Sequence, residues 1–264
     1  AGETPRGLHA IRVLDGRKDF TLERLREAAF DSYLPAFEQL LPRLLAAYGS
    51  AALDDSVKSE LAEPIAALRS WDYRWGASSV PTTLAVYWGE ALAAEVSDDA
   101  AAADLRTYDY MVTRAKPAQL VDAFVAARER LIRDFGTWKT PWGEINRFQR
   151  LNGALEQPFR DSGPSTPVPF TSSQWGSLAA FGARTYPGTK RRYGTYGNTF
   201  VAVVEFGKDS VRARAVSPGG ESGDPKSPHF NDQAERYATG NLREVYFYPD
   251  QLRGHTERSY HPGQ

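Results

Sequence analysis

The chain has 264 residues, 41% of them hydrophobic, and its 32 Lys and Arg residues nearly balance its 33 Asp and Glu residues. A near-neutral chain has no overall field that would attract nucleic acid or an anionic membrane surface, so a small molecule or another protein is the expected partner. The absence of cysteine excludes disulfides, thiolate metal sites and cysteine nucleophiles. No apolar run reaches the roughly 18 residues that cross a bilayer, so no membrane span is expected.

The first residues, 1–19, are polar and charged where a secretory signal peptide would carry an apolar segment. We therefore expect any export signal to lie on a preceding segment, and residues 1–264 to be a single fragment of a larger protein.

From residue 20 to about residue 135 the apolar residues recur at helical spacing, and residues 1–136 are predicted to form a helical part. Capping residues, or a proline at the first helical position, mark the helix starts. The expected helices run from about Asp19 to Ala29, Leu34 to Leu45, Asp55 to Leu68, Ser79 to Leu92, and Lys116 to Leu131.

After Gly136 the composition changes, because Gly, Pro, Ser and Thr become frequent and helical periodicity disappears. Residues 137–195 are predicted to form irregular loops. A loop region of this size suggests that the loops wrap a partner structure or line a site.

Residues 196–264 are predicted to form the closing strands and a C-terminal segment. The strands Thr199–Phe206 and Val211–Val216 should pair as a hairpin, and a last strand should follow at Arg243–Tyr248. A short helix is expected from about Asn231 to Tyr237, ending at Gly240. Three strands with one apolar face are not stable alone, so strands from elsewhere or the helical layer must complete this sheet.

The run from Gly219 to Gln233, with the sequence GGESGDPKSPHFNDQ, is the most specific pattern in the chain. Its glycines and prolines are typical of an ordered turn cluster, and Asp232 is expected to cap or brace the helix that Gln233 enters. With its flanks, from Tyr196 to Phe247, the run resembles the closing segment of the large subunit of the penicillin acylase family.

Two shorter matches extend this resemblance to essentially the whole chain. Leu68-Arg69-Ser70-Trp71-Asp72 resembles the Leu-x-x-Trp-Asp run of the family's helical part. Arg6 and Arg12-Val13-Leu14, followed by Phe20-Thr21-Leu22, resemble the stretch that leads into those helices. In style the C-terminal run is closer to acylases that cleave acyl-homoserine lactones or lipopeptide antibiotics than to the benzylpenicillin enzymes.

The resemblance implies an α+β fold: the C-terminal part of an αββα N-terminal-nucleophile hydrolase sandwich, with a helical layer followed by antiparallel strands. It also implies an amidohydrolase whose precursor cuts itself to expose an N-terminal serine. The serine hydroxyl attacks an amide carbonyl, and its own α-amino group serves as the base. The substrate would be an N-acyl amide such as an acyl-homoserine lactone, a lipopeptide or a β-lactam side chain.

This chain departs from the family pattern at residue 1, because Ala1 has no hydroxyl. We therefore expect the chain to begin downstream of the nucleophile and to be inactive alone. The family's oxyanion asparagine and calcium-ligand aspartate precede the arginine that Arg6 matches. No cofactor or metal is expected in this chain, and a structural calcium would belong to the complete enzyme.

Arg6 is the one catalytic-site residue that the resemblance carries over, as a group that supports the oxyanion region. A solvated arginine at a frayed terminus is the alternative.

The expected partners are the remainder of the large subunit and the small subunit of the same precursor, together with a small-molecule N-acyl substrate and no nucleic acid. The expected location is periplasmic or secreted. The alternative from another class is a non-catalytic binding or interaction module with acylase-like architecture. An N-terminal nucleophile upstream in the same reading frame would favour the enzyme.

The histidines have simple interpretations. His229 lies in a turn-rich segment, where an imidazole bonded to the backbone is a better interpretation than a general base. His255 and His261 have no third ligand suggested beside them, which argues against a metal site. His9 has no special context.

The remaining polar and aromatic clusters also favour structural roles. The pairs Asp54-Asp55 and Asp98-Asp99 are expected to cap helices rather than act as paired catalytic carboxylates. The basic and aromatic stretch Lys190–Tyr196 suits a solvated loop, or a contact to the missing subunit, better than nucleic acid. The tryptophans are expected in the core or at an interface, and none is assigned to substrate.

Overall fold

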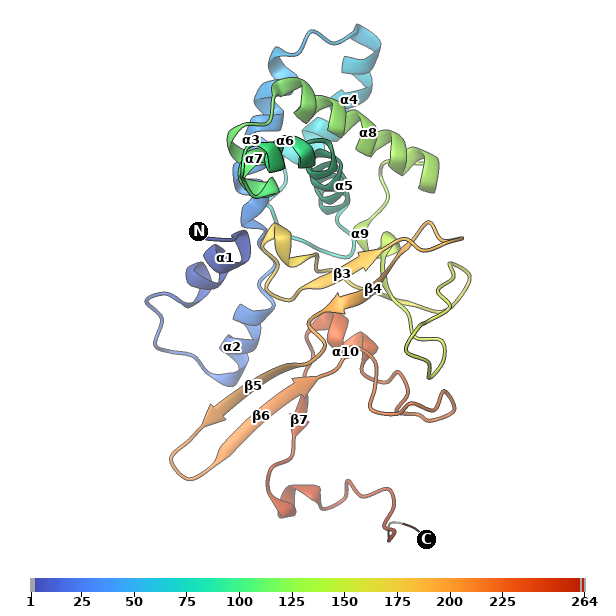
Figure 1. The fold of residues 1–264 in the computed structure, drawn as a ribbon. Helices are drawn as coiled ribbons and strands as arrows, with labels where there is room; N and C mark the ends of the chain where they lie inside the picture. The colour runs from blue at the N-terminus through green and yellow to red at the C-terminus, as the bar shows by residue number, and fades with distance from the viewer. Residues whose placement is uncertain (1–2, 262, 264) are drawn as a thin grey trace.

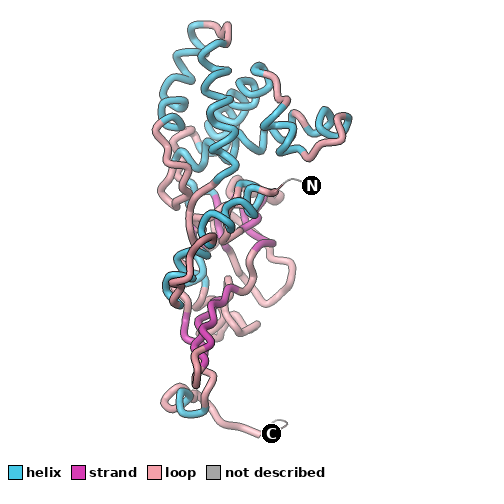
Figure 2. Tube along the Cα trace, turned by 90° about the vertical axis from the view of Figure 1, so that its left-hand side faces the viewer, coloured by secondary structure: helices cyan, strands magenta, loops and turns pink. Residues whose placement is uncertain are grey.

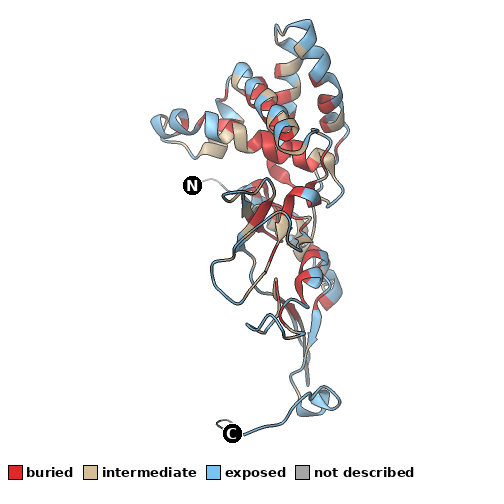
Figure 3. Cartoon of the chain, turned by 90° about the vertical axis from the view of Figure 1, so that its right-hand side faces the viewer, coloured by how far each residue is buried: buried red, intermediate tan, exposed pale blue. Residues whose placement is uncertain are grey.

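A helical layer, a short four-stranded sheet and a projecting three-stranded sheet follow one another along an elongated molecule (Figures 1 and 2). The structure is a computed structural model that describes residues 3–261 and residue 263. Buried residues concentrate in the helical layer and around the sheets, whereas the C-terminal end of the chain is exposed (Figure 3). Helices followed by mostly antiparallel strands confirm the predicted α+β class.

The helices fall mainly in the first half of the chain and the strands in the second. The helices are α1 (Pro5–Leu14), α2 (Leu22–Ala29), α3 (Pro35–Ser50), α4 (Asp55–Arg69), α5 (Val80–Glu95), α6 (Ser97–Ala102), α7 (Thr107–Thr113), α8 (Pro117–Phe135), α9 (Trp142–Ile145) and α10 (Ala234–Thr239), with single 3-10 turns η1 (Ser173–Trp175) and η2 (Pro249–Leu252). The strands are β1 (Asn146–Phe148), β2 (Thr166–Pro167), β3 (Phe181–Arg184), β4 (Arg192–Gly197), β5 (Val201–Phe206), β6 (Val211–Val216) and β7 (Arg243–Val245).

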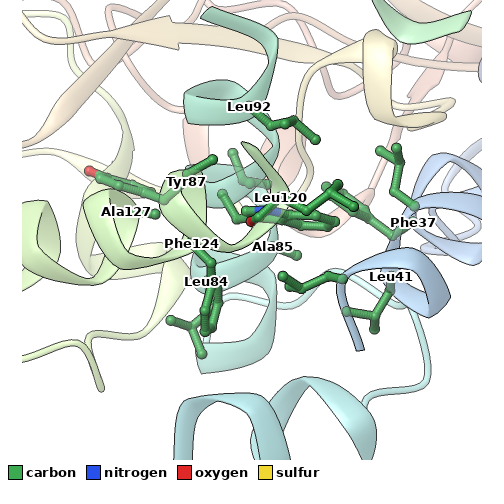
Figure 4. Packing of buried hydrophobic residues seen from close by; sticks show 14 of the residues in the cluster. Phe37, Leu41, Leu84, Ala85, Tyr87, Leu92, Leu120, Phe124 and Ala127 are labelled. Carbon is green, nitrogen blue, oxygen red and sulfur yellow. The ribbon is translucent and has the colours of Figure 1, made fainter. Parts of the chain in front are cut away.

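Helix α5 is the centre of the helical layer and packs against α8 and α4. Its residues from Thr82 to Gly89 are all buried, so no face of this part of the helix meets solvent. Around it lie large apolar side chains from α3 and α8 (Figure 4). Burying one such side chain stabilises the fold by about 1.5–3 kcal/mol, which makes this cluster the main source of stability in the helical part.

The predicted helix starts are confirmed at Asp55, at Ser79 and at Lys116, but the start of α2 was placed wrongly. Thr21, not Asp19, caps α2, because its hydroxyl accepts a hydrogen bond from the backbone N–H of Arg24 at 3.3 Å. Asp19 lies outside the helix and pairs with the Arg24 side chain instead.

Helix α1 was not predicted, although its residues Leu8, Ile11 and Leu14 recur at a helical spacing of three. Thr4 caps it by accepting from the Gly7 N–H at 3.1 Å, and Pro5 occupies its first turn.

Residues 137–195 do include long loops, but they also contain the strands β1 to β4, and this corrects the prediction of an entirely irregular segment. The strand order is β2-β1-β4-β3, with β1 and β4 parallel and the other pairs antiparallel. Strands of two to six residues are too short for hydrophobic periodicity to identify.

The predicted hairpin is confirmed as β5 and β6, whose register runs from Val201 opposite Val216 to Phe206 opposite Val211. Strand β7 adds antiparallel to β6 but ends at Val245 rather than Tyr248. One face of this sheet turns toward α2, where Arg214 pairs with Glu23 at 3.1 Å.

Arg150 organises the run from Gly219 to Gln233. Its guanidinium donates to the carbonyls of Gly220, Ser222 and Phe230 at 3.1, 2.9 and 2.6 Å, and lies 4.3 Å from the centre of the Phe230 ring. One arginine from the chain just after β1 thus adds three hydrogen bonds to those that the side chains of the run make within it.

Asp232 does not cap α10, for which Gln233 is the N-terminal cap residue. Its carboxylate instead accepts from His229 Nδ1 at 2.9 Å and so braces the run from within. The predicted end of this helix at Gly240 is confirmed, with a φ of 67° that favours glycine.

Candidate active-site region

Arg6 lies in the first turn of α1 and is not part of a frayed terminus. Its Nη2 donates to the backbone carbonyl of Leu178 at 2.8 Å, which joins α1 to the chain just after η1. The side chain remains exposed beyond this bond. The helix therefore presents one guanidinium at a fixed place on the surface between the helical layer and the sheets.

Arg6 lines an apolar cavity of about 260 Å³ to which α1, α2, the chain after η1 and the start of β5 contribute. Only Arg6 and Asn198 among its lining residues are polar. The apolar lining residues are Ala10, Val13, Leu14, Leu25, Ala28, Ala29, Leu178, Ala179 and Val201. Such an apolar lining accommodates a hydrocarbon group or an apolar segment of polypeptide.

Asn198, the other polar lining residue of this cavity, already has hydrogen-bond partners. Its Oδ1 accepts from the Ala180 N–H at 2.6 Å, and its backbone carbonyl accepts from the Tyr237 hydroxyl at 2.7 Å. Burial raises the pKa of Tyr237, so its hydroxyl stays protonated and remains a donor. The lining residues of this cavity thus supply a cation and apolar surface, but no hydroxyl nucleophile and no carboxylate or imidazole base.

On its other side Arg6 lines a second cavity of about 290 Å³, together with Arg106, Tyr108 and Ser173. Arg106 is held by Asp109 through two bonds of 2.6 and 2.9 Å. Arg6 therefore separates an apolar cavity from a more polar one.

His9 holds α1, and with it Arg6, in place. The imidazole is fully buried; Nδ1 donates to the Gly176 carbonyl at 2.8 Å, and Nε2 lies 3.1 Å from Asp31 Oδ1. The two ring nitrogens therefore contact two different segments of the chain, the loop after η1 and the loop after α2. Gly176 has a φ of 103°, and a Cβ there would lie 2.4 Å from Pro35, so only glycine fits.

Asp31 is the centre of this polar network. The hydrogen bond from His9, followed by the backbone N–H of Tyr33 and the charge of Arg74, lowers its pKa from the ordinary 3.8 to about 2, against the opposing effect of burial. The carboxylate is therefore ionised at neutral pH, and it contacts both His9 and Arg74. The sequence interpretation missed His9, although its spacing of three residues from Arg6 would place both on one side of a helix.

Ala1, on which the expected absence of the nucleophile depends, lies outside the described residues. No group of three or more His, Asp or Glu side chains within residues 3–261 is arranged to hold a metal ion. Among the helices that the structure describes, none has the length and apolar character of a membrane span.

His229 is exposed and is bound by carboxylates rather than by the backbone, which corrects the expected contact. Nδ1 lies 2.9 Å from Asp232 Oδ2 and Nε2 lies 2.7 Å from Glu257 Oε1. Asp232 and then Glu257 raise its pKa. His255 stacks on Tyr246 with ring centres 4.5 Å apart. It belongs to no group of metal-binding side chains among the described residues.

The predicted caps at the aspartate pairs are only partly correct. Asp54 is the cap residue of α4 but makes no side-chain cap bond, and Asp98 lies in the first turn of α6. Asp99 accepts from Gln119 at 3.1 Å, so its carboxylate joins α6 to α8.

The stretch Lys190–Tyr196 is not a solvated loop, because most of it forms β4. Arg192 is buried there and donates to Glu90 of α5 at 2.7 Å, with its guanidinium 4.1 Å from the Tyr87 ring centre. Trp71, Trp88, Trp142 and Trp175 are buried, as expected of core residues.

The architecture defines an α+β chain with a helical layer, closing strands and a cation-lined apolar cavity between them. The sequence profile of the penicillin amidase family matches residues 1–254. The chain belongs to this family, which confirms the resemblance drawn from the run at Gly219–Gln233 and from the shorter helical matches.

A solved structure has the same fold. The chain is similar to a thermostable penicillin G acylase from Alcaligenes faecalis, with a TM-score of 0.50 and 16% sequence identity over 97% of this chain. The match covers 52% of the acylase chain, so the present chain spans about half the length of that relative.

Proposed function

We propose that this chain is the C-terminal part of the large subunit of an amidohydrolase that removes the acyl group from an N-acyl compound. The observation that carries the proposal is the family match over residues 1–254. The nucleophile would be an N-terminal serine on the rest of the protein, with its own α-amino group as the base. The chain alone would then be inactive, in agreement with a cavity lining that has no nucleophile or base.

Arg6 is the residue that we propose to act at the active site, by supporting the groups that stabilise the oxyanion. Its support is geometric: the bond to Leu178 and the buried His9 contacts fix the guanidinium in the lining of the apolar cavity. A preorganised cation strengthens the stabilisation of negative charge because it need not reorganise during the reaction.

The rest of the large subunit is the partner that we propose for the uncovered face of the β5–β6–β7 sheet. This face presents Val204, Phe206 and Ala213, of which Phe206 is 82% exposed. The length of the Alcaligenes acylase that this chain does not match is enough to supply further strands. A sheet face of this kind needs such a cover to be stable.

Substitution of Arg6 tests the proposed function. In the complete protein, Arg6→Ala should lower kcat/KM for an N-acyl substrate, by less than the roughly 100-fold that the loss of a direct oxyanion donor costs, because Arg6 acts through those donors. Arg17→Ala, which removes an exposed arginine in the loop after α1, should leave kcat/KM unchanged. Equal effects of the two substitutions would contradict the proposed role of Arg6.

The substrate and the location are proposed from the sequence alone. We infer a long-chain acyl-homoserine lactone or a lipopeptide as the substrate, in a periplasmic or secreted enzyme. Assays of the complete protein with acyl-homoserine lactones, phenylacetyl amides and glutaryl amides distinguish the acyl groups. If the intact gene product has no serine-initiated subunit and cleaves none of them, the non-catalytic interaction module replaces the enzyme as the interpretation.

A further inference from the structure

The junction between helix α5 and the four-stranded sheet encloses a small polar cavity of about 40 Å³. It is lined from α5 by Glu90, from α9 by Trp142, from β1 by Asn146, from η1 by Trp175 and from β4 by Arg192. Phe181 and Ala183 of β3 also line it, so the cavity touches six separate elements at the point where the helical layer meets the sheet.

Two of these side chains have a polar atom that the rest of the described chain does not satisfy. The indole N–H groups of Trp142 and Trp175 are buried and have no hydrogen-bond partner among the described residues, and each of the two residues is only 2% exposed. An unpaired buried donor is costly, and native proteins rarely leave one without a partner. Because both tryptophans line the same cavity, one acceptor in it can satisfy both donors.

The chemistry of the lining restricts what the acceptor is. An indole N–H donates only, so the occupant must accept hydrogen bonds. Glu90 and the Oδ1 of Asn146 are acceptors, because the Asn146 Nδ2 already donates to the carbonyls of Val168 and Phe170. The occupant should therefore also donate, which water does and a halide ion does not.

The volume of the cavity and the charge of its lining also favour water as the occupant. A cavity needs roughly 10–15 Å³ of solvent-accessible volume to hold one water, so about 40 Å³ suffices for water but not for a larger organic ligand. Arg192 and Glu90 form an ion pair at 2.7 Å, so the lining carries no excess positive charge to hold an anion.

We propose that this cavity is a buried hydration site, in which water accepts from the Trp142 and Trp175 indoles and donates to Glu90 or Asn146. The water links α5 to α9, η1 and the sheet, and so fixes the junction across which the two cores of the molecule meet.

A crystal structure of the complete protein at a resolution that shows ordered water is the first test. The expected result is density within 2.7–3.2 Å of both indole nitrogens, the range of ordinary hydrogen bonds. A bromide soak distinguishes the source of any density: an anomalous peak in the cavity would show a halide and overturn the proposal. A cavity without density would overturn it as well.

Indole resonances of the ¹⁵N-labelled protein provide a second test that does not depend on crystals. Trp→Phe substitutions assign the signals. The N–H groups of Trp142 and Trp175 should show cross-relaxation with a long-lived water. Trp88 is the matched control, because its indole is equally buried but donates to the Leu120 carbonyl at 3.0 Å, and it should show none. The same behaviour at all three indoles would contradict a specific site.

Discussion

His9 contributes more to the active-site region than its plain sequence context indicated. It bonds the Gly176 carbonyl and Asp31 from a fully buried position, and Arg74 bonds the same Asp31 oxygen at 3.2 Å. These contacts hold helix α1 in place, and the bond to the Leu178 carbonyl then positions the Arg6 guanidinium, one helical turn from His9.

Replacement of His9 by Phe should lower the free energy of unfolding by about 2–4 kcal/mol. The ring remains, but the Gly176 carbonyl and the Asp31 carboxylate both lose a donor while they stay at least partly buried. Urea denaturation measures the change. His255→Phe, which alters a histidine of the exposed C-terminal segment, is the matched control and should change stability by less than about 0.5 kcal/mol. Equal changes in the unfolding free energy for His9→Phe and His255→Phe would show that the His9 contacts do not stabilise the fold.

Asp31 should make the protein sensitive to acid. Its pKa is lowered from 3.8 to about 2 in the folded chain, so the folded state favours the ionised form. The stabilisation is therefore complete above about pH 4 and is lost as the pH falls from 4 to 2. Because the carboxylate is partly exposed, the loss is about 1–2 kcal/mol. Asp31→Asn should be less stable than wild type at pH 6, and the difference should shrink by this amount at pH 2, as measured by urea denaturation; a constant difference would exclude the effect.

At the scale of elements, the run Gly219–Gln233 depends on contacts from outside itself. Arg150 satisfies three of its carbonyls, and the Gln233 N–H donates to the Gly219 carbonyl at 2.7 Å, which closes the turn cluster. Gln233 Oε1 also accepts from the Ser217 N–H at 3.1 Å. The run is therefore a packed unit, and its Gly220 allows the close approach of the His229 backbone carbonyl.

Gly220 and Gly223 provide a matched pair of substitutions within this unit. A Cβ at Gly220 would lie 2.2 Å from the His229 carbonyl oxygen, whereas a Cβ at Gly223 would meet nothing within 4 Å. We expect Gly220→Ala to lower the unfolding free energy by about 1–3 kcal/mol, because a backbone oxygen must move. Gly223→Ala should be neutral or slightly stabilising. Thermal denaturation of both variants measures this, and a larger loss for Gly223→Ala would contradict the packing.

For the whole molecule, the two hydrophobic cores meet at Trp75, which packs against both the helical cluster and the sheet cluster. The sheet cluster is the smaller, and the outer face of β5 and β6 adds little to it. The chain therefore has one end where buried residues concentrate and one end that is mostly exposed (Figure 3). The exposed residues of this second end include Val204 and Phe206.

Phe206→Asp should distinguish the role of the Phe206 ring in the stability of the isolated chain from its role in association with the rest of the subunit. In the isolated chain the ring is 82% exposed, so the substitution should change stability by less than about 0.5 kcal/mol. In the complete protein it should weaken association with the rest of the subunit by at least about tenfold, since a charge would replace a buried ring. Co-purification of the separately expressed parts measures this, with Lys208→Asp in the adjacent turn as the control. If Phe206→Asp associates as wild type does, another surface carries the contact.

The sequence by itself predicted the α+β class, five of the main helices, the β5–β6 hairpin and the family, because helical periodicity, caps and the Gly219–Gln233 run are local patterns. The tertiary structure alone revealed the four-stranded sheet, the burial of Arg192 against Glu90 and the anchoring of Arg6 through His9. These features join residues far apart in the chain: Glu90 and Arg192 are 102 positions apart, and His9 and Gly176 are 167 apart. No local pattern encodes such contacts, because packing of whole elements brings these groups together.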